Sequence, residues 1–190
     1  MSYQAVDIAN FYINLANNIS DEDMTNIKVN KMIYFAQAWS LLRLKRPLFE
    51  EDIEAWPLGP VVPNVYQTFK PCGRERIRDV SDDSYSEDIF STEDLELLID
   101  VAREYGQYTA GRLVDITHES GDPWKITMDE NKKIIDKETI KRCFSKKRML
   151  PRFEVDEAAL ETIGYRDKEG TIVLPYEYYC PEDDIYDEVQ

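Results

Sequence analysis

The first half of this chain alternates hydrophobic and polar positions with a helical period. Between residues 5 and 16, apolar side chains recur at steps of three and four, which places them on one helix face. A second helix is expected from about Asn26 to Lys45, and ten of the thirteen residues from Met32 to Leu44 are apolar. A helix that is apolar on nearly every side is buried in the middle of its domain. This helix is therefore predicted to be the centre of the fold.

Capping residues place the later helices. Ser91 or Thr92 can begin a helix that Gly106 ends, and a shorter helix is expected over residues 110–119. Asp122, which precedes a proline, and Asp136 can each open a further helix. The polar stretch over residues 70–90 is predicted to be a long surface loop.

The stretch EAWPLGPVVPNVYQTF, residues 54–69, interrupts this pattern with three prolines and a glycine. We expect a small β element over residues 52–56, a turn at Leu58 and Gly59, and a helix that restarts near Val61 with Pro60 in its first turn. Prolines fix backbone torsions, so such a segment loses little entropy when it docks on a partner. Trp and Tyr are enriched at binding hot spots. The candidate partner-binding residues of this segment are Trp56, Pro60, Pro63 and Tyr66.

The tryptophans also fit a purely structural interpretation. All three tryptophans, Trp39, Trp56 and Trp124, can be buried core residues, and the Gly-Pro turn can let one helix pack on another. That interpretation is favoured for Trp39 and Trp124, whereas both interpretations stay open for Trp56 and Tyr66.

The character of the chain changes near Leu150. Residues 154–190 contain 12 acidic and 2 basic residues, a net charge of −10, whereas the preceding 153 residues carry only −5 of the total of −15. A short helix near residues 154–165 and a β-like segment over residues 171–179 are expected there. The predicted fold is mainly α: a compact helical domain (1–150) with a buried central helix and a small β element, followed by an acidic C-terminal extension (151–190) of mixed α/β structure. The extension adds three candidate partner-binding residues, Tyr176, Tyr178 and Tyr179.

Composition disfavours several classes of function. The acidic balance disfavours binding to nucleic acids and to anionic membranes, because the mean field repels phosphate. A basic cluster over residues 141–148 fits either a nucleic-acid footprint or, in the favoured interpretation, a helix C-terminus that pairs with the acidic extension. No apolar run approaches the length that spans a bilayer, and the first residues lack the pattern of a secretory signal. Three distant cysteines suit neither a disulfide framework nor a metal site, so a cytoplasmic location is expected.

Little in the sequence indicates catalysis. His118 is the single histidine, and a lone histidine beside a helix end is usually structural. No phosphate-binding glycine loop, zinc-type spacing or Ser/His/Asp arrangement can be assembled around it. We therefore expect no enzyme, no metal and no cofactor; an enzyme centred on His118 is the alternative to be tested.

Two stretches resemble the SocA-like antitoxin family, also called the Panacea domain and grouped with phage-associated GepA-type proteins. The first runs from Asn26 to Phe69 and carries the family's order of aromatic, proline and glycine positions. Those positions are Lys31, Tyr34, Phe35, Ala38, Trp39, Pro47, Leu48, Phe49, Glu54, Trp56, Gly59, Pro60, Pro63 and Tyr66. The second, LVDITHESGDPWK, carries Thr117, His118, Pro123 and Trp124. The resemblance covers about residues 5–149.

The resemblance implies an antitoxin that binds and neutralises a cognate protein toxin. It also implies two related roles: an adaptor that delivers the toxin to an ATP-dependent protease, and a phage-encoded inhibitor of a host defence toxin. The family positions Lys31, Tyr34, Phe35, Trp39, Glu54, Gly59, His118, Pro123 and Trp124 are expected to be mainly structural. The chain lacks the N-terminal helix-turn-helix of some relatives, and the extension has no counterpart in the family, so the extension is expected to supply the toxin-specific contact.

Overall fold

The computed structural model describes residues 2–19, 23–78, 86 and 89–152, together with the backbone of 165–166 and 172–173. The chain divides into two compact units, Met1–Phe153 and Glu154–Gln190. The helices of the first unit are α1 (Ala5–Ile19), α2 (Asn26–Arg43), α3 (Pro63–Phe69), α4 (Thr92–Tyr105), α5 (Ala110–Thr117), α6 (Pro123–Asp129) and α7 (Lys137–Phe144), with a 3₁₀ turn, η1 (Lys70–Cys72). A short antiparallel hairpin joins β1 (Glu54–Trp56) to β2 (Gly59–Val61). The predicted mainly α fold with a small β element is confirmed.

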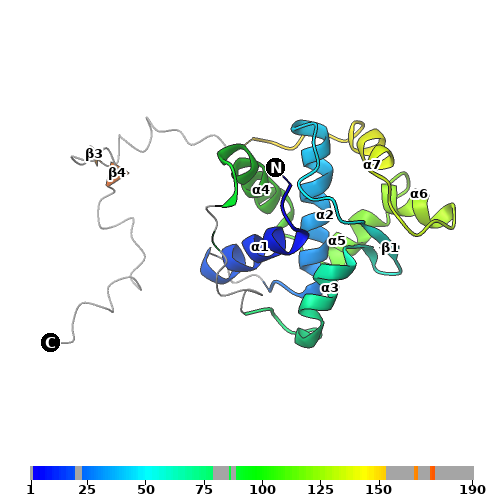
Figure 1. The fold of residues 1–190 in the computed structure, drawn as a ribbon, viewed down its shortest axis with the longest axis horizontal. Helices are drawn as coiled ribbons and strands as arrows, with labels where there is room; N and C mark the ends of the chain where they lie inside the picture. The colour runs from blue at the N-terminus through cyan, green and yellow to red at the C-terminus, as the bar shows by residue number, and fades with distance from the viewer. Residues whose placement is uncertain are drawn as a thin grey trace. The chain divides into compact units, whose positions relative to one another are not determined.

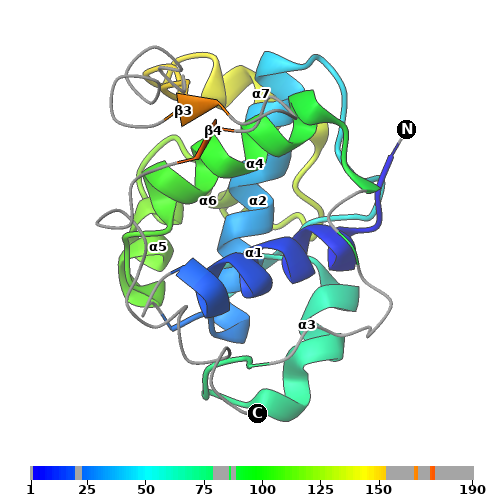
Figure 2. The ribbon, with the colours of Figure 1, turned by 90° about the vertical axis from the view of Figure 1, so that its left-hand side faces the viewer.

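Helix α2 is the centre of the first unit, as its apolar sequence predicts. Fifteen of its eighteen residues are buried. Helices α1, α3, α4, α5 and α7 and strand β2 all pack against it, and it runs through the middle of the unit in both views (Figure 1, Figure 2). Its aromatic residues form the core with their neighbours: Phe35 stacks on Tyr105 of α4 at a centroid distance of 3.9 Å, and Trp39 meets Phe144 of α7 edge to face.

The buried polar residues of α2 hold the irregular backbone that follows it. Asn30 accepts a hydrogen bond from the backbone N–H of Val62 (3.0 Å), and Asn26 donates to the carbonyl of Tyr66 (3.0 Å). Gln37 donates to the carbonyl of Phe49 and accepts from the backbone N–H of Leu48. Buried backbone groups need such partners. Helix α2 therefore orders residues 48–66 as well as filling the core.

The expected caps are present at the later helices. Ser91, Asp122 and Asp136 each accept a hydrogen bond from a backbone N–H in the first turn of α4, α6 and α7. Gly106 is the C-cap of α4, and α5 begins after Thr109 within the expected range. These ends are set by local sequence.

Two boundaries differ from the sequence-based expectation. Helix α3 begins at Pro63 and not near Val61, because residues 59–61 pair with β1; Pro60 therefore lies in β2, and Pro63 takes the first helical position. Helix α2 ends at Arg43, two residues before the expected end, and Lys45 adopts a positive φ of 61°.

The second unit contains a second antiparallel hairpin. Strands β3 (Tyr165–Arg166) and β4 (Ile172–Val173) pair with Tyr165 opposite Val173. Strand β4 falls within the β-like segment expected over residues 171–179. Of the helix expected near residues 154–165, residues 154–164 lie outside the described residues, and Tyr165 lies in β3.

Candidate interaction site on the β1–β2 hairpin

The hairpin turns through two residues, Pro57 and Leu58, between the paired Trp56 and Gly59. Gly59 has φ +99°, a left-handed conformation that side chains with a Cβ rarely adopt. On the outer side of β1, the backbone N–H of Ala55 donates to the carbonyl of Lys133 at 2.8 Å. The hairpin is thus bordered on one side by the segment that leads into α7.

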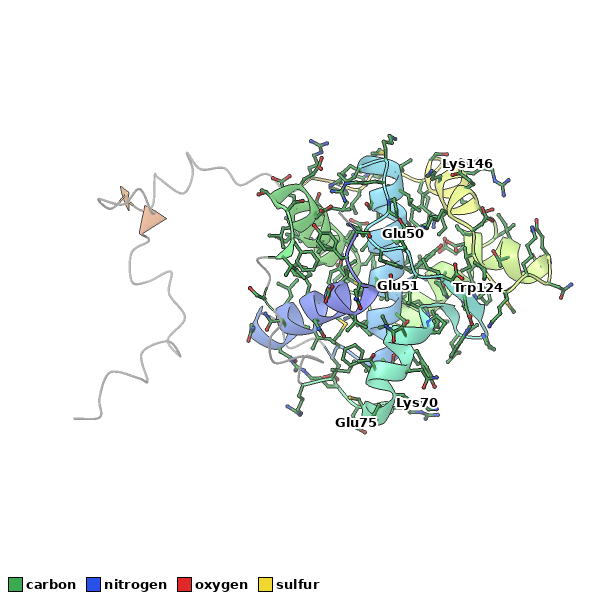
Figure 3. All side chains as sticks on the ribbon, viewed as in Figure 1. Glu50, Glu51, Lys70, Glu75, Trp124 and Lys146 are labelled. Atoms are coloured by element: carbon green, nitrogen blue, oxygen red, sulfur yellow. The ribbon has the colours of Figure 1, made fainter. Side chains whose placement is uncertain are left out.

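Three main-chain carbonyl oxygens of the hairpin lie within hydrogen-bond distance of side chains from three helical elements. Trp124 of α6 donates its indole N–H to the carbonyl of Trp56 at 2.8 Å, and Lys31 of α2 donates from Nζ to the carbonyl of Pro60 at 3.0 Å. Nε2 of His118, the C-cap of α5, lies 3.2 Å from the carbonyl oxygen of Pro57. We call Lys31, His118 and Trp124 the carbonyl clamp. Trp124 lies on the α6 side of the hairpin (Figure 3).

The two rings of the clamp support each other. The centroids of His118 and Trp124 are 3.7 Å apart, and Nδ1 of His118 lies 2.6 Å from the carbonyl oxygen of Val114 in the preceding turn. Both ring nitrogens of His118 therefore face main-chain oxygens. This is the geometry of a structural anchor.

Lys31 and Gly59 meet closely beneath the hairpin. A Cβ at Gly59 would lie 2.6 Å from Cε of Lys31 and 2.8 Å from Oγ1 of Thr117. Lys31 is almost fully buried, and desolvation lowers its pKa to about 7. The absence of a side chain at position 59 is thus what allows the Lys31 amine to reach the hairpin.

We expect the stability of the fold to depend on pH through Lys31. An unfolded lysine titrates near pH 10.4, so between pH 7 and that value the unfolded state binds more protons at this residue. The free energy of unfolding should therefore rise with pH by roughly 1.4 kcal/mol per unit from this group. Urea unfolding at pH 7, 8 and 9 of the natural chain and of Lys31→Met isolates it: the difference in free energy, natural minus variant, should increase by roughly 2 kcal/mol over this range.

The lost hydrogen bond to Pro60 in Lys31→Met shifts the whole curve by about 1 kcal/mol and adds no slope. Parallel curves for the two proteins would show that Lys31 does not change its protonation state in this range.

The outer face of the hairpin carries apolar side chains. The ring of Trp56 meets that of Tyr66 of α3 edge to face at 4.9 Å, and both are half-buried. Leu58 at the tip is 55% exposed, and Pro57 beside it is exposed. We define Trp56, Pro57, Leu58 and Tyr66 as the hairpin surface. It is an apolar projection on an anchored backbone.

A small polar group borders this surface. Glu54 accepts hydrogen bonds from the indole N–H of Trp56 (2.7 Å) and from Lys133 (2.8 Å). The hydrogen bond from Lys133 and, after it, that from Trp56 lower the pKa of Glu54, against the opposing effect of burial. The carboxylate fixes the orientation of the Trp56 ring.

The remaining predicted residues lie in three places. Tyr34, Phe35 and Trp39 are buried in the core, and Pro123 is the buried first residue of α6. Pro60 is buried in β2, so it offers its carbonyl to Lys31 and no surface, whereas Pro63 is half-buried at the start of α3. The three candidates Tyr176, Tyr178 and Tyr179 lie outside the described residues.

Sequence reasoning missed two features of this region. Leu58 was placed in the expected turn but was not named as a candidate partner-binding residue, although it is 55% exposed at the tip. Asp122 was identified only as a cap, yet it also accepts hydrogen bonds from Tyr34 OH (3.2 Å) and from Lys147 Nζ (3.1 Å). Burial raises the pKa of Asp122, opposed chiefly by the charge of Lys147.

Within the described residues, no three or more His, Cys, Asp and Glu side chains gather in a way that could hold a metal ion. In the same part of the chain, no helix combines the length and apolar character needed to cross a membrane.

Comparisons with known proteins connect this geometry to a family. Residues 29–125 match the model of the family described as "Antitoxin SocA-like, Panacea domain". Antitoxin SocA of Caulobacter vibrioides (strain NA1000 / CB15N) is 30% identical over 139 residues, which cover 65% of this chain and 71% of that protein. No solved structure matches the chain. All three clamp residues and the hairpin surface lie within the matched region.

Proposed function

The chain belongs to the family of SocA-like antitoxins with a Panacea domain, and we propose that it neutralises its toxin by binding it directly, without catalysing a reaction. Membership in the family supports an antitoxin role and implies a cognate toxin as partner. The finer proposal is that the hairpin surface is a contact site for that toxin.

One observation carries the proposal: an exposed leucine and two half-buried aromatic rings project from a backbone that is already fixed. Aromatic residues dominate binding hot spots, and their energy comes from desolvation in a well-packed contact. Trp56 and Tyr66 already hold each other in an edge-to-face pair. Ordering such a surface in advance lowers the entropy lost on binding.

The acidic extension is proposed as a second contact. Its net charge of −10 suits a basic surface on a toxin, and complementary charge accelerates association. Removal of residues 152–190 tests this contribution in the assay described next; unchanged protection and unchanged association would remove the extension from the proposal.

The test uses Leu58→Asp in the full chain. Because Leu58 is exposed, the substitution should leave the free energy of unfolding within about 0.5 kcal/mol of the natural value. In a contact it would bury an unpaired charge and remove an apolar anchor, so toxin affinity should fall at least about tenfold. The probe is the product of the reading frame beside this gene: its toxicity in co-expression and its affinity by calorimetry are measured with each antitoxin variant.

Ile89→Asp is the matched control, because Ile89 is 48% exposed and lies before α4, on another element. It should protect as the natural chain does. Equal affinity of the natural chain and of Leu58→Asp for a toxin that the natural chain binds would remove the hairpin surface from the proposal.

The alternative function is delivery of the bound toxin to an ATP-dependent protease. An adaptor would lose protection in a host without the ATP-dependent protease, whereas an antitoxin that blocks its toxin by occupancy would keep it. A role of this protein as a phage-encoded inhibitor of a host defence toxin would involve the same binding step, and the Leu58→Asp test applies to it unchanged.

A further inference from the structure

The side chains of the carbonyl clamp contact the hairpin on both sides of its exposed tip, Leu58. Its three oxygen acceptors belong to Trp56, Pro57 and Pro60, so they flank Leu58 on both sides along the chain. None of the three clamp side chains belongs to the hairpin surface. Lys31 and Trp124 are buried, so these two side chains can act on a partner only through the hairpin, whereas His118 is half-buried.

The clamp also joins elements that are distant in sequence. Lys31 comes from α2, His118 from the end of α5 and Trp124 from α6, and the acceptor oxygens lie 29 to 68 residues away along the chain. A two-stranded hairpin alone is marginally stable in water. Its fixed geometry thus depends on these contacts and on the flanking segment at Lys133.

We propose that His118 and Trp124, with Lys31, are positioning residues that preset the hairpin tip and so determine toxin affinity without touching the toxin. This inference rests on the proposed function and names the residues that maintain its binding surface. When the tip is released, it must be ordered again on binding, and the observed affinity falls in proportion to the fraction of molecules in the competent state.

His118 provides the sharpest test, because its two nitrogens face different carbonyl oxygens; a neutral imidazole carries one N–H and donates to one of them, whereas the imidazolium donates to both. Nδ1 faces the carbonyl of Val114 within its own helix, whereas Nε2 faces Pro57 of the hairpin. An asparagine amide nitrogen lies about as far from the backbone as Nδ1, and a glutamine amide nitrogen about as far as Nε2. His118→Asn should keep the helix contact and lose the hairpin contact; His118→Gln should do the reverse.

The first measurement is amide hydrogen exchange across residues 55–61 in the full chain, which needs no toxin. Loss of one hydrogen bond of about 1 kcal/mol should make exchange roughly fivefold faster in His118→Asn. His118→Gln should stay close to the natural chain. Trp124→Phe, which removes the indole N–H and keeps an aromatic ring beside His118, should accelerate exchange by a similar factor.

The second measurement is affinity for the same toxin probe. His118→Asn and Trp124→Phe should weaken binding by up to about fivefold, a limit that is reached when the released tip is the major conformation, and His118→Gln should restore it. A glutamine cannot act as an imidazole acid–base group, so full protection by His118→Gln also argues against a catalytic role.

The outcomes separate the two proposals. Equal exchange in His118→Asn, His118→Gln and the natural chain would overturn the clamp. Faster exchange in His118→Asn alone, with a toxin that is insensitive to Leu58→Asp, would support the clamp and reject the hairpin surface as the toxin contact. Faster exchange without any loss of affinity, for a toxin that is sensitive to Leu58→Asp, would overturn the effect on binding.

Discussion

Gly59→Ala is expected to lower the free energy of unfolding by about 4 kcal/mol. Two effects add at this position. The left-handed φ of +99° is strained for any residue with a Cβ, which costs about 1–3 kcal/mol. The added methyl group would also meet Lys31 Cε at 2.6 Å and Thr117 Oγ1 at 2.8 Å, and crowding in a packed interior costs about 1–3 kcal/mol. Urea unfolding followed by the helical signal measures the sum.

Gly121→Ala is the matched control for the backbone effect. Gly121 has a similar φ of +84°, but nothing lies within 4 Å of a Cβ built there. It should cost only the strain of roughly 1–3 kcal/mol. If the two variants were equally stable, the close approach of Lys31 to Gly59 would not contribute.

Asp122→Ala is expected to destabilise the fold by about 3 kcal/mol. The variant loses the cap of α6, which is worth about 1 kcal/mol. It also leaves the buried hydroxyl of Tyr34 without its acceptor, at about 1–3 kcal/mol. The ion pair with Lys147 adds little, because the Lys147 side chain is 28% exposed and can turn to water.

Asp136→Ala is the control that separates the contribution of helix capping from that of the buried hydrogen bonds of Asp122. Asp136 caps α7 with nearly the same backbone geometry (φ −71°, ψ 148°, against −69° and 146° at Asp122), but it is exposed. Its loss should cost about 1 kcal/mol. Similar thermal and urea midpoints for the two variants would contradict a special role of the Asp122 side chain beneath α2.

The helices were predictable from the sequence because their signals are local. Ser91, Asp122 and Asp136 act within one turn of their own position, and the apolar run of α2 directly indicates burial. The hairpin was less predictable. The proline pattern fits either a helix start at Pro60 or a strand. In the structure, residues 59–61 pair with β1, so Pro60 lies in a strand.

The clamp could not be derived from spacing, because its contacts join residues far apart in the chain. A lysine in the middle of an apolar helix is a visible signal of a buried partner, yet nothing in the sequence indicates that the partner is the carbonyl of Pro60. The resemblance includes Lys31, His118 and Trp124 among its motif positions, and in the structure these three side chains all face carbonyl oxygens of one hairpin. The partner-binding role of Trp56 and Tyr66 stays a prediction.

The anchoring of this hairpin through main-chain oxygens has an evolutionary consequence. Every amino acid carries the same carbonyl group, so contacts made to main-chain oxygens of the hairpin do not depend on which side chains its tip exposes. Leu58 contributes none of the three gripped oxygens, and position 58 is therefore free to diversify while the scaffold beneath it stays constant. We expect that a substitution at position 58 can change which partner surface the tip fits without removing any contact that holds the hairpin.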